Sequence, residues 1–197
     1  MRAAGSKLAI ALCLTACVYA LSLLPQVLQL EPTAVAQGQL WRLITAHFTH
    51  SHFNHYLINT IAAWILYFGF FSFVSGVELI KYSAVYSLLI SLGLLAFYPE
   101  IIWYNGLSGL LHALLLHFSV QAAVNRRPLY WSAVVIVWLK VLLESISTYT
   151  GYVAYLGEMQ VISEAHLIGV IAATVIAMCF YLLATTNKSN GDFSTND

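Results

Sequence analysis

Charged residues are scarce in this 197-residue chain: they make up 8 % of it, whereas a soluble domain carries about a quarter. Hydrophobic residues make up 60 %, which is more apolar surface than a soluble fold of this length can hide. Eight lysines and arginines balance eight aspartates and glutamates, so the chain lacks the basic field that attracts nucleic acid. The composition therefore predicts an integral membrane protein that contacts lipids and does not bind nucleic acid.

Cysteine is also rare, and zinc-binding motifs are missing. The three cysteines, Cys13, Cys17 and Cys179, lie in apolar stretches and form no Cys-x-x-Cys pair. The sequence contains no His-Glu-x-x-His motif of the kind that holds catalytic zinc. We therefore expect no disulfide framework, no metal site and no cofactor.

Six apolar segments are each long enough to cross a bilayer as a helix, which takes about 20 mostly apolar residues. They cover residues 8–28, 53–74, 79–98, 106–124, 129–148 and 161–184. We expect the first to be retained rather than cleaved as a signal peptide, because it is long and no clean cleavage site follows it. The sequence thus predicts an all-α, six-helix membrane domain over residues 1–184 and a polar, disordered cytoplasmic tail over residues 185–197.

Positive charges predict the orientation of these segments. Six of the eight lysines and arginines fall on one side of a six-helix arrangement: Arg2, Lys7, Lys81, Arg126, Arg127 and Lys188. Because short loops rich in lysine and arginine stay in the cytoplasm, both termini are predicted to be cytoplasmic. The loops 29–52, 99–105 and 149–160 then face outward, and the first of them is the longest.

Two residues suited to catalysis enter the membrane from this outward side. Ser108 lies about two residues into the fourth segment and His166 about five residues into the sixth. At 1.5 Å per residue, both lie within roughly 10 Å of the outward boundary. A serine hydroxyl needs a base within hydrogen-bond reach, and neutral histidine is the usual one near pH 7. Their matched depth predicts a Ser108 nucleophile with His166 as its base.

Small residues surround both candidates. Gly106 and Gly109 flank the serine and permit tight backbone geometry there. Gly169 and Ala173 form a small-xxx-small face one turn below the histidine. These residues predict that the fourth and sixth helices approach each other closely.

Four short motifs, taken in order, resemble the pattern of the rhomboid intramembrane serine proteases. They are W-R-x-x-T at 41–45, H-x-x-x-x-H-x-x-x-N at 50–59, G-x-S-G at 106–109 and A-H-x-x-G at 165–169. The resemblance implies a six-helix rhomboid-like bundle and a Ser108–His166 dyad with no acidic third member.

The same resemblance implies roles for the loop and the second segment. His55 and Asn59 would stabilise the oxyanion together with the backbone N–H of Ser108. His50 would be structural, and Trp41 and Arg42 would anchor the outer loop. The i, i+4 spacing of His55 and Asn59 puts both side chains on one helix face, as a two-donor clamp requires.

A narrower resemblance is to the rhombosortase branch, whose motif G-L-S-G-x-L-H is similar to residues 106–112. It implies transmembrane protein substrates that carry a C-terminal Gly-Gly motif, a helix and a basic tail. It also implies a site in the bacterial inner membrane that opens toward the periplasm and matures secreted or surface proteins.

Three further polar residues have more than one interpretation. His112 either supports Ser108 or competes with His166 as the base, and a histidine on the serine's own helix points poorly at its hydroxyl. Glu144 either forms a structural ion pair with Lys140 or reads the substrate or supports the site. Glu164 is expected to meet substrate or tune the site without being catalytic.

Two alternative functions remain open on the sequence. One is a catalytically silent rhomboid-like protein that binds membrane clients, which the intact Ser108 and His166 disfavour. The other is a metal-dependent membrane enzyme that uses the histidines of the first loop. These are His47, His50, His52 and His55, and no acidic ligand accompanies them.

Overall fold

The computed structural model describes residues 2–125, 127–147 and 162–192, and within them every regular element is a helix. One isolated β-bridge joins Leu30 to Tyr104. Six long helices match the six apolar segments: α1 (Arg2–Leu21), α5 (Phe53–Ile65), α6 (Gly76–Phe97), α7 (Ser108–Val124), α8 (Tyr130–Ser147) and α9 (Ser163–Asp192). The predicted all-α fold is confirmed. The predicted loop 149–160, with Arg126 and Val161, lies outside the described residues.

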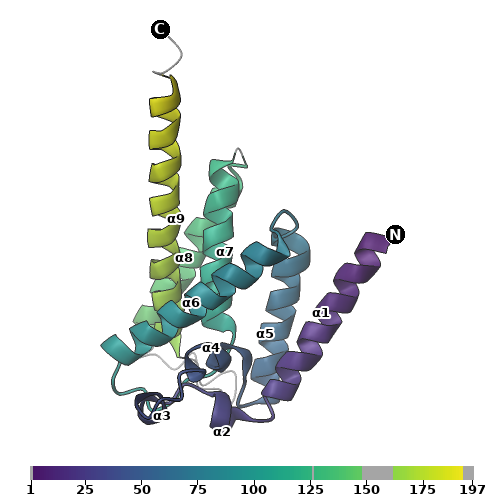
Figure 1. Cartoon of the computed structure of the whole chain (residues 1–197), viewed down its shortest axis with the longest axis vertical. Helices are drawn as coiled ribbons and strands as arrows, with labels where there is room; N and C mark the ends of the chain where they lie inside the picture. Colours follow the sequence, from purple (N-terminus) through teal and green to yellow (C-terminus); the bar gives the residue numbers. More distant parts are fainter. Residues whose placement is uncertain (1, 126, 148–161, 193–197) are drawn as a thin grey trace.

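Short helices fill the first loop and gather at one end of the bundle (Figure 1). They are α2 (Pro25–Leu28), α3 (Pro32–Ala36), α4 (Arg42–Thr45) and the 3₁₀ turn η1 (Ala46–Phe48). Both α7 and α9 begin at this end, whereas α1 begins and α9 ends away from it (Figure 1). The first residues of α7 and α9 therefore lie beside the folded loop.

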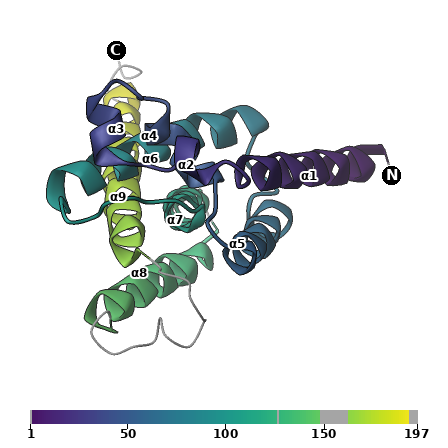
Figure 2. The same ribbon diagram turned by 90° about the horizontal axis from the view of Figure 1, so that it is seen from below.

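Helix α7 lies at the centre of the bundle, with α5, α6, α8 and α9 around it (Figure 2). Twelve of its 17 residues are buried, as expected for a helix that is apolar on every side. Helix α1 stands at the edge, packs mainly on α5 and exposes much of its apolar surface. The centre of the fold is thus the helix that begins with Ser108.

Helices α7 and α9 pack closely, as their small residues predict. A Cβ atom added to Gly169 would lie 2.7 Å from the carbonyl oxygen of Gly109, so only glycine permits this approach. Ala113, Ala165 and Ala173 are fully buried. Close contact between these backbones brings the start of α9 against the start of α7.

Two predicted segments end earlier than expected. Helix α1 stops at Leu21 instead of residue 28, because Pro25 disfavours helix in the residue before it and begins α2 instead. Helix α5 gives way at Leu66–Phe70 to a π-helical turn, closed by the Phe71 N–H on the Leu66 carbonyl oxygen at 2.7 Å. Helix α9, by contrast, continues past residue 184 to Asp192, so residues 185–192 of the expected disordered tail are helical.

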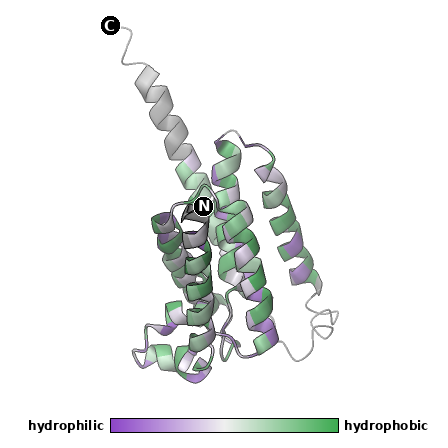
Figure 3. Cartoon of the chain, turned by 90° about the vertical axis from the view of Figure 1, so that its right-hand side faces the viewer, coloured by the Kyte–Doolittle hydropathy of each residue, from purple (hydrophilic) through white to green (hydrophobic). Residues whose placement is uncertain are grey.

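By length and composition, two helical stretches are able to cross a membrane: Gly76–Phe97 and Ser163–Tyr181. The apolar parts of two others, Lys7–Leu21 and Ser108–Val124, are shorter. Hydrophobic residues nevertheless dominate the long helices, and hydrophilic residues gather toward the end with the short helices (Figure 3). The described residues thus give membrane-length spans for two of the six predicted segments.

Candidate active site

Ser108 and His166 lie in hydrogen-bonding contact. Ser108 is the first residue of α7, and His166 is in the first turn of α9. Nε2 of His166 is 2.8 Å from Oγ of Ser108. The histidine is 3 % exposed, whereas the serine is partly accessible. At this distance the imidazole can accept the hydroxyl proton when the oxygen attacks an electrophile.

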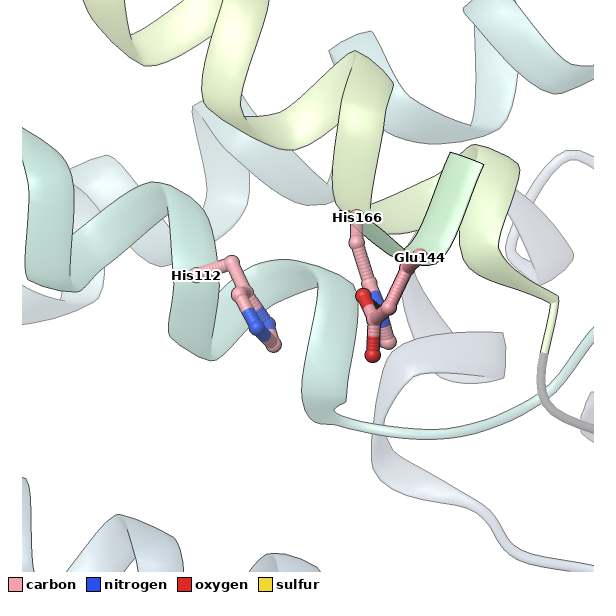
Figure 4. Close-up of side chains that lie close together, drawn as sticks. All are labelled: His112, Glu144 and His166. Carbon is pink, nitrogen blue, oxygen red and sulfur yellow. Dashed lines mark hydrogen bonds and ion pairs between the residues drawn. The ribbon is translucent and has the colours of Figure 1, made fainter. Parts of the chain in front are cut away.

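A carboxylate from a third helix contacts the other ring nitrogen of the histidine. Nδ1 of His166 is 2.9 Å from Oε2 of Glu144 on α8, and Figure 4 shows the two side chains turned toward each other. The family pattern implied a dyad without an acidic member. In the structure the Glu144 carboxylate contacts the ring nitrogen of His166 that does not face Ser108.

Glu144 also pairs with Lys140, one turn earlier on α8. Lys140 Nζ donates to Glu144 Oε1 at 2.6 Å. The ion pair expected from the sequence is therefore present, and the same carboxylate reaches His166 with its second oxygen. The side chain of Glu164, the other acidic candidate, forms no hydrogen bond with a side chain of the described residues. A chain of hydrogen bonds thus runs from Lys140 through Glu144 and His166 to Ser108.

His112 lies over the catalytic histidine candidate. Its Nδ1 is 2.7 Å from the backbone oxygen of Ser108, and because a carbonyl only accepts, this nitrogen carries a proton. Its ring stacks on that of His166, with centroids 4.3 Å apart and an interplanar angle of 21°. His112 therefore bonds to the serine's backbone and not to its hydroxyl, which favours His166 as the base.

Among the residues that the structure describes, one cluster has the composition of a metal site. Ligand atoms of His112, Glu144 and His166 lie within 4.8 Å of one another (Figure 4). Each of these side chains already has a hydrogen-bond partner in the protein. A metal ion there would have to break the contact between His166 and Glu144 or between His166 and Ser108.

On the opposite side of Ser108, a neutral histidine holds the amide of Asn59. Asn59 Nδ2 lies 3.0 Å from His50 Nε2, and His50 Nδ1 lies 3.1 Å from Ser22 Oγ. The Ser22 hydroxyl donates to the Val18 carbonyl oxygen, so it accepts from His50 Nδ1, and Nε2 is left to accept from the amide. Burial lowers the pKa of His50 to about 3, consistent with this neutral ring.

His55 lies against the residues that precede the serine. Its ring centre is 5.0 Å from that of His50. A Cβ atom on Gly106 would lie 2.6 Å from the His55 ring, and Gly106 has a φ of +127°, which side-chain-bearing residues rarely adopt. Gly106 therefore lets the backbone pass His55 at contact distance.

The start of α7 leaves backbone donors available beside these side chains. Leu107, the residue before this helix, forms no capping hydrogen bond to its first N–H groups. Such groups have no partner within the helix and attract negative charge. His55 contacts Gly106, two residues before Ser108, and Asn59 is joined to the same group of side chains through His50.

The family pattern of the rhomboid domain matches residues 37–183, about three quarters of the chain. The chain belongs to the rhomboid family. Rhomboid proteins are embedded in membranes, and the family is generally one of intramembrane serine proteases that act on transmembrane substrates. No curated protein matches the chain in sequence.

Arg42 and Trp41 fix the first loop of this rhomboid domain. Arg42 is 4 % exposed and donates to the carbonyl oxygens of Gln26 and Gln29 at 2.9 and 2.7 Å. Trp41 Nε1 donates to the Val27 carbonyl oxygen at 3.0 Å. Both side chains thus bind the loop to the segment that follows α1.

Sequence analysis missed the buried hydrogen bonds that His47 and Tyr104 form in this rhomboid domain. His47 Nε2 donates to the Ser87 carbonyl oxygen at 3.0 Å, and Tyr104 Oη donates to the Gly106 carbonyl oxygen at 2.8 Å. Burial lowers the pKa of His47 to about 4. The only signal was the position of Tyr104 just before the G-x-S-G motif. Because His47 and His50 bond to protein groups in different places, the structure does not support a four-histidine metal site.

Proposed function

We propose that this chain is an intramembrane serine endopeptidase in which Ser108 is the nucleophile and His166 the general base. The observation that carries the proposal is the 2.8 Å contact between His166 Nε2 and Ser108 Oγ at the start of two closely packed helices. A silent, client-binding rhomboid-like protein would not need this pairing.

In the proposed reaction, His166 Nε2 takes the hydroxyl proton while Ser108 Oγ attacks the scissile carbonyl carbon. The resulting oxyanion accepts hydrogen bonds from the Ser108 backbone N–H, His55 and Asn59. His166 then returns the proton to the leaving amine, and an acyl-enzyme remains on Ser108. Water hydrolyses this ester, or an amine acceptor takes the acyl group.

The proposal includes six membrane spans, with both termini in the cytoplasm and the site opening outward. The starts of α1 and α6 and the end of α7 lie away from the short helices of the first loop (Figure 1). Lys7 and Lys81 belong to the first two turns of α1 and α6, and Arg127 follows α7, which supports this orientation. In a bacterial inner membrane, the site would then face the periplasm.

For substrates, we propose the class implied by the rhombosortase resemblance: membrane proteins with a C-terminal Gly-Gly motif, a helix and a basic tail. The residue that distinguishes this branch motif is His112. His112 contacts the Ser108 backbone and the His166 ring, which supports a role of this residue at the site.

The test is cleavage of a membrane-anchored reporter that ends in Gly-Gly, a helix and a basic tail. Ser108→Ala and His166→Ala should each lower turnover by about 10³-fold or more while the protein still inserts into the membrane. A reporter with Ala-Ala in place of Gly-Gly is the matched substrate control. Cleavage by Ser108→Ala would refute the mechanism, and binding without cleavage by the wild type would identify a silent client-binding protein.

A further inference from the structure

We propose that Glu144 is a positioning residue that turns the Ser108–His166 pair into a Ser–His–Glu triad. This inference rests on the proposed protease function and adds a residue that the family pattern does not contain. Three side chains from three helices stand in line, with contacts of 2.9 Å from Glu144 Oε2 to His166 Nδ1 and 2.8 Å from His166 Nε2 to Ser108 Oγ.

The first argument concerns the proton on the imidazole. A neutral histidine carries one ring proton, and a carboxylate can only accept a hydrogen bond. Glu144 therefore holds the proton on Nδ1 and leaves the lone pair on Nε2, which faces Ser108. Without the carboxylate, the proton could occupy Nε2 instead, and that tautomer cannot act as a base toward the serine.

The second argument concerns the orientation of the ring. His112 stacks on one face of the imidazole, which opposes rotation about the Cβ–Cγ bond, but stacked rings can still slide along each other. The bond from Nδ1 to Glu144 opposes that movement. Together, the stacked ring and the carboxylate keep Nε2 aimed at Ser108 Oγ.

Lys140 explains how the carboxylate stays charged in an apolar setting. An isolated ionised carboxylate in a membrane segment is costly, and a neighbouring ammonium group offsets that cost. Lys140 Nζ donates to the oxygen that His166 does not use. The pair is nearly neutral as a whole, so the main effect of Glu144 on the reaction is the tautomer and aim of His166.

The competing interpretation is that Glu144 only forms an ion pair with Lys140 within α8. Breaking this pair from either end separates the two interpretations, because only Glu144 contacts His166. Glu144→Gln keeps the side-chain size but allows the amide to donate to Nδ1 and stabilise the wrong tautomer. Lys140→Met removes the ion pair and leaves the carboxylate in place.

The experiment measures kcat and KM for reporter cleavage, together with the labelling rate by a fluorophosphonate probe, whose fluoride Ser108 Oγ displaces. Glu144→Gln should lower kcat and the labelling rate by about 100-fold or more at constant KM. Lys140→Met should lower them less than about tenfold. Glu100→Gln, which removes an exposed carboxylate from the loop before α7, should match the wild type.

Each other outcome decides something. Wild-type kcat in Glu144→Gln overturns the triad and leaves the protease proposal standing. A wild type that neither cleaves the reporter nor labels overturns the protease proposal itself. If Glu144→Gln fails to accumulate, Glu144→Asp replaces it: the charge remains, but the carboxylate is withdrawn by one methylene. The triad then requires a lower kcat at constant KM, and full activity refutes it.

Discussion

The two sides of the site are held by different forces. On the side of Ser108 and His166, α7 and α9 meet through small residues, and contact between their backbones sets the distance between the two side chains. On the side of His55 and Asn59, the Asn59 amide is held by a hydrogen bond to the buried, neutral His50, which Ser22 after α1 holds in turn. The first arrangement depends on shape and the second on protonation state.

This difference indicates which kinds of substitution should disrupt each side of the site. Overpacking between α7 and α9 moves whole helices and displaces both reacting groups together. Loss of a hydrogen bond in the loop removes one donor and leaves the nucleophile and base in place. The contact between α7 and α9 should therefore be sensitive to larger side chains. The hydrogen bonds of the first loop should be sensitive to protonation of their histidines.

Among the changes that test this comparison, Gly169→Val is expected to have the largest combined effect on cleavage and stability. Its side chain would enter the space taken by the Gly109 carbonyl oxygen, 2.7 Å from a Cβ atom, and would force α9 away from α7. Cleavage should fall by about 100-fold or more, and the free energy of unfolding by about 1–3 kcal/mol. Gly76→Ala is the matched control, because a Cβ atom there meets open space. An active Gly169→Val would show that backbone proximity does not set the distance between nucleophile and base.

A comparable effect on catalysis, with less displacement of the helices, is expected from Asn59→Ala. Removal of one oxyanion donor typically lowers kcat by about 10²–10³-fold. The measurement is kcat and KM for the reporter, with the exposed neighbour variant Asn54→Ala as the control. Wild-type kcat in Asn59→Ala would exclude the amide from the oxyanion site.

Acidification should weaken the loop side. His47 and His50 are buried and neutral, with pKa values lowered to about 4 and about 3, whereas an unfolded histidine titrates near 6.5. Below pH 6.5 the unfolded chain therefore binds protons that the folded chain does not, and stability falls as the pH falls. Between the folded and the unfolded pKa of each histidine, the free energy of unfolding falls by up to about 1.4 kcal/mol for each pH unit of acidification.

Unfolding in detergent between pH 7.5 and pH 5 measures this loss. His50→Gln should be less stable at neutral pH but should lose less stability on acidification than the wild type. Identical pH dependence in the two proteins would show that His50 is not a source of the effect.

The smallest effect is expected from a metal chelator. The ligand atoms gathered by His112, Glu144 and His166 are already engaged in hydrogen bonds that the proposed mechanism uses. Reporter cleavage should therefore be unchanged after incubation with EDTA. Loss of cleavage that zinc restores would replace the serine mechanism with a metal-dependent one.

The contact between Ser108 and His166 could be anticipated from the sequence because depth along a helix follows from counting residues at 1.5 Å each. The glycines and alanines around them also indicated a close approach. Both predictions need only the position of a residue along its own helix. They do not require knowledge of how neighbouring helices are rotated.

The contact between Glu144 and His166 depends on that rotation. Apolar residues surround much of α8, so its sequence does not define which side faces α9. The depth of Glu144 was predictable, but the nitrogen that it reaches was not. The bond from Tyr104 to the Gly106 carbonyl oxygen was equally hidden, because it depends on the path of a loop.

Helix α1 and the turn after it support residues of the candidate site. Ser22, at the turn after α1, accepts a hydrogen bond from His50, and Thr15 within α1 binds the side chains of Tyr56 and Trp64 on α5. Thr15 and Ser22 both lie before residue 37, where the match to the family begins. A chain trimmed to the matched residues would keep its nucleophile, base and carboxylate but would lose the hydroxyl that orients the Asn59 amide through His50. The residues that support the site thus extend beyond those that match the family.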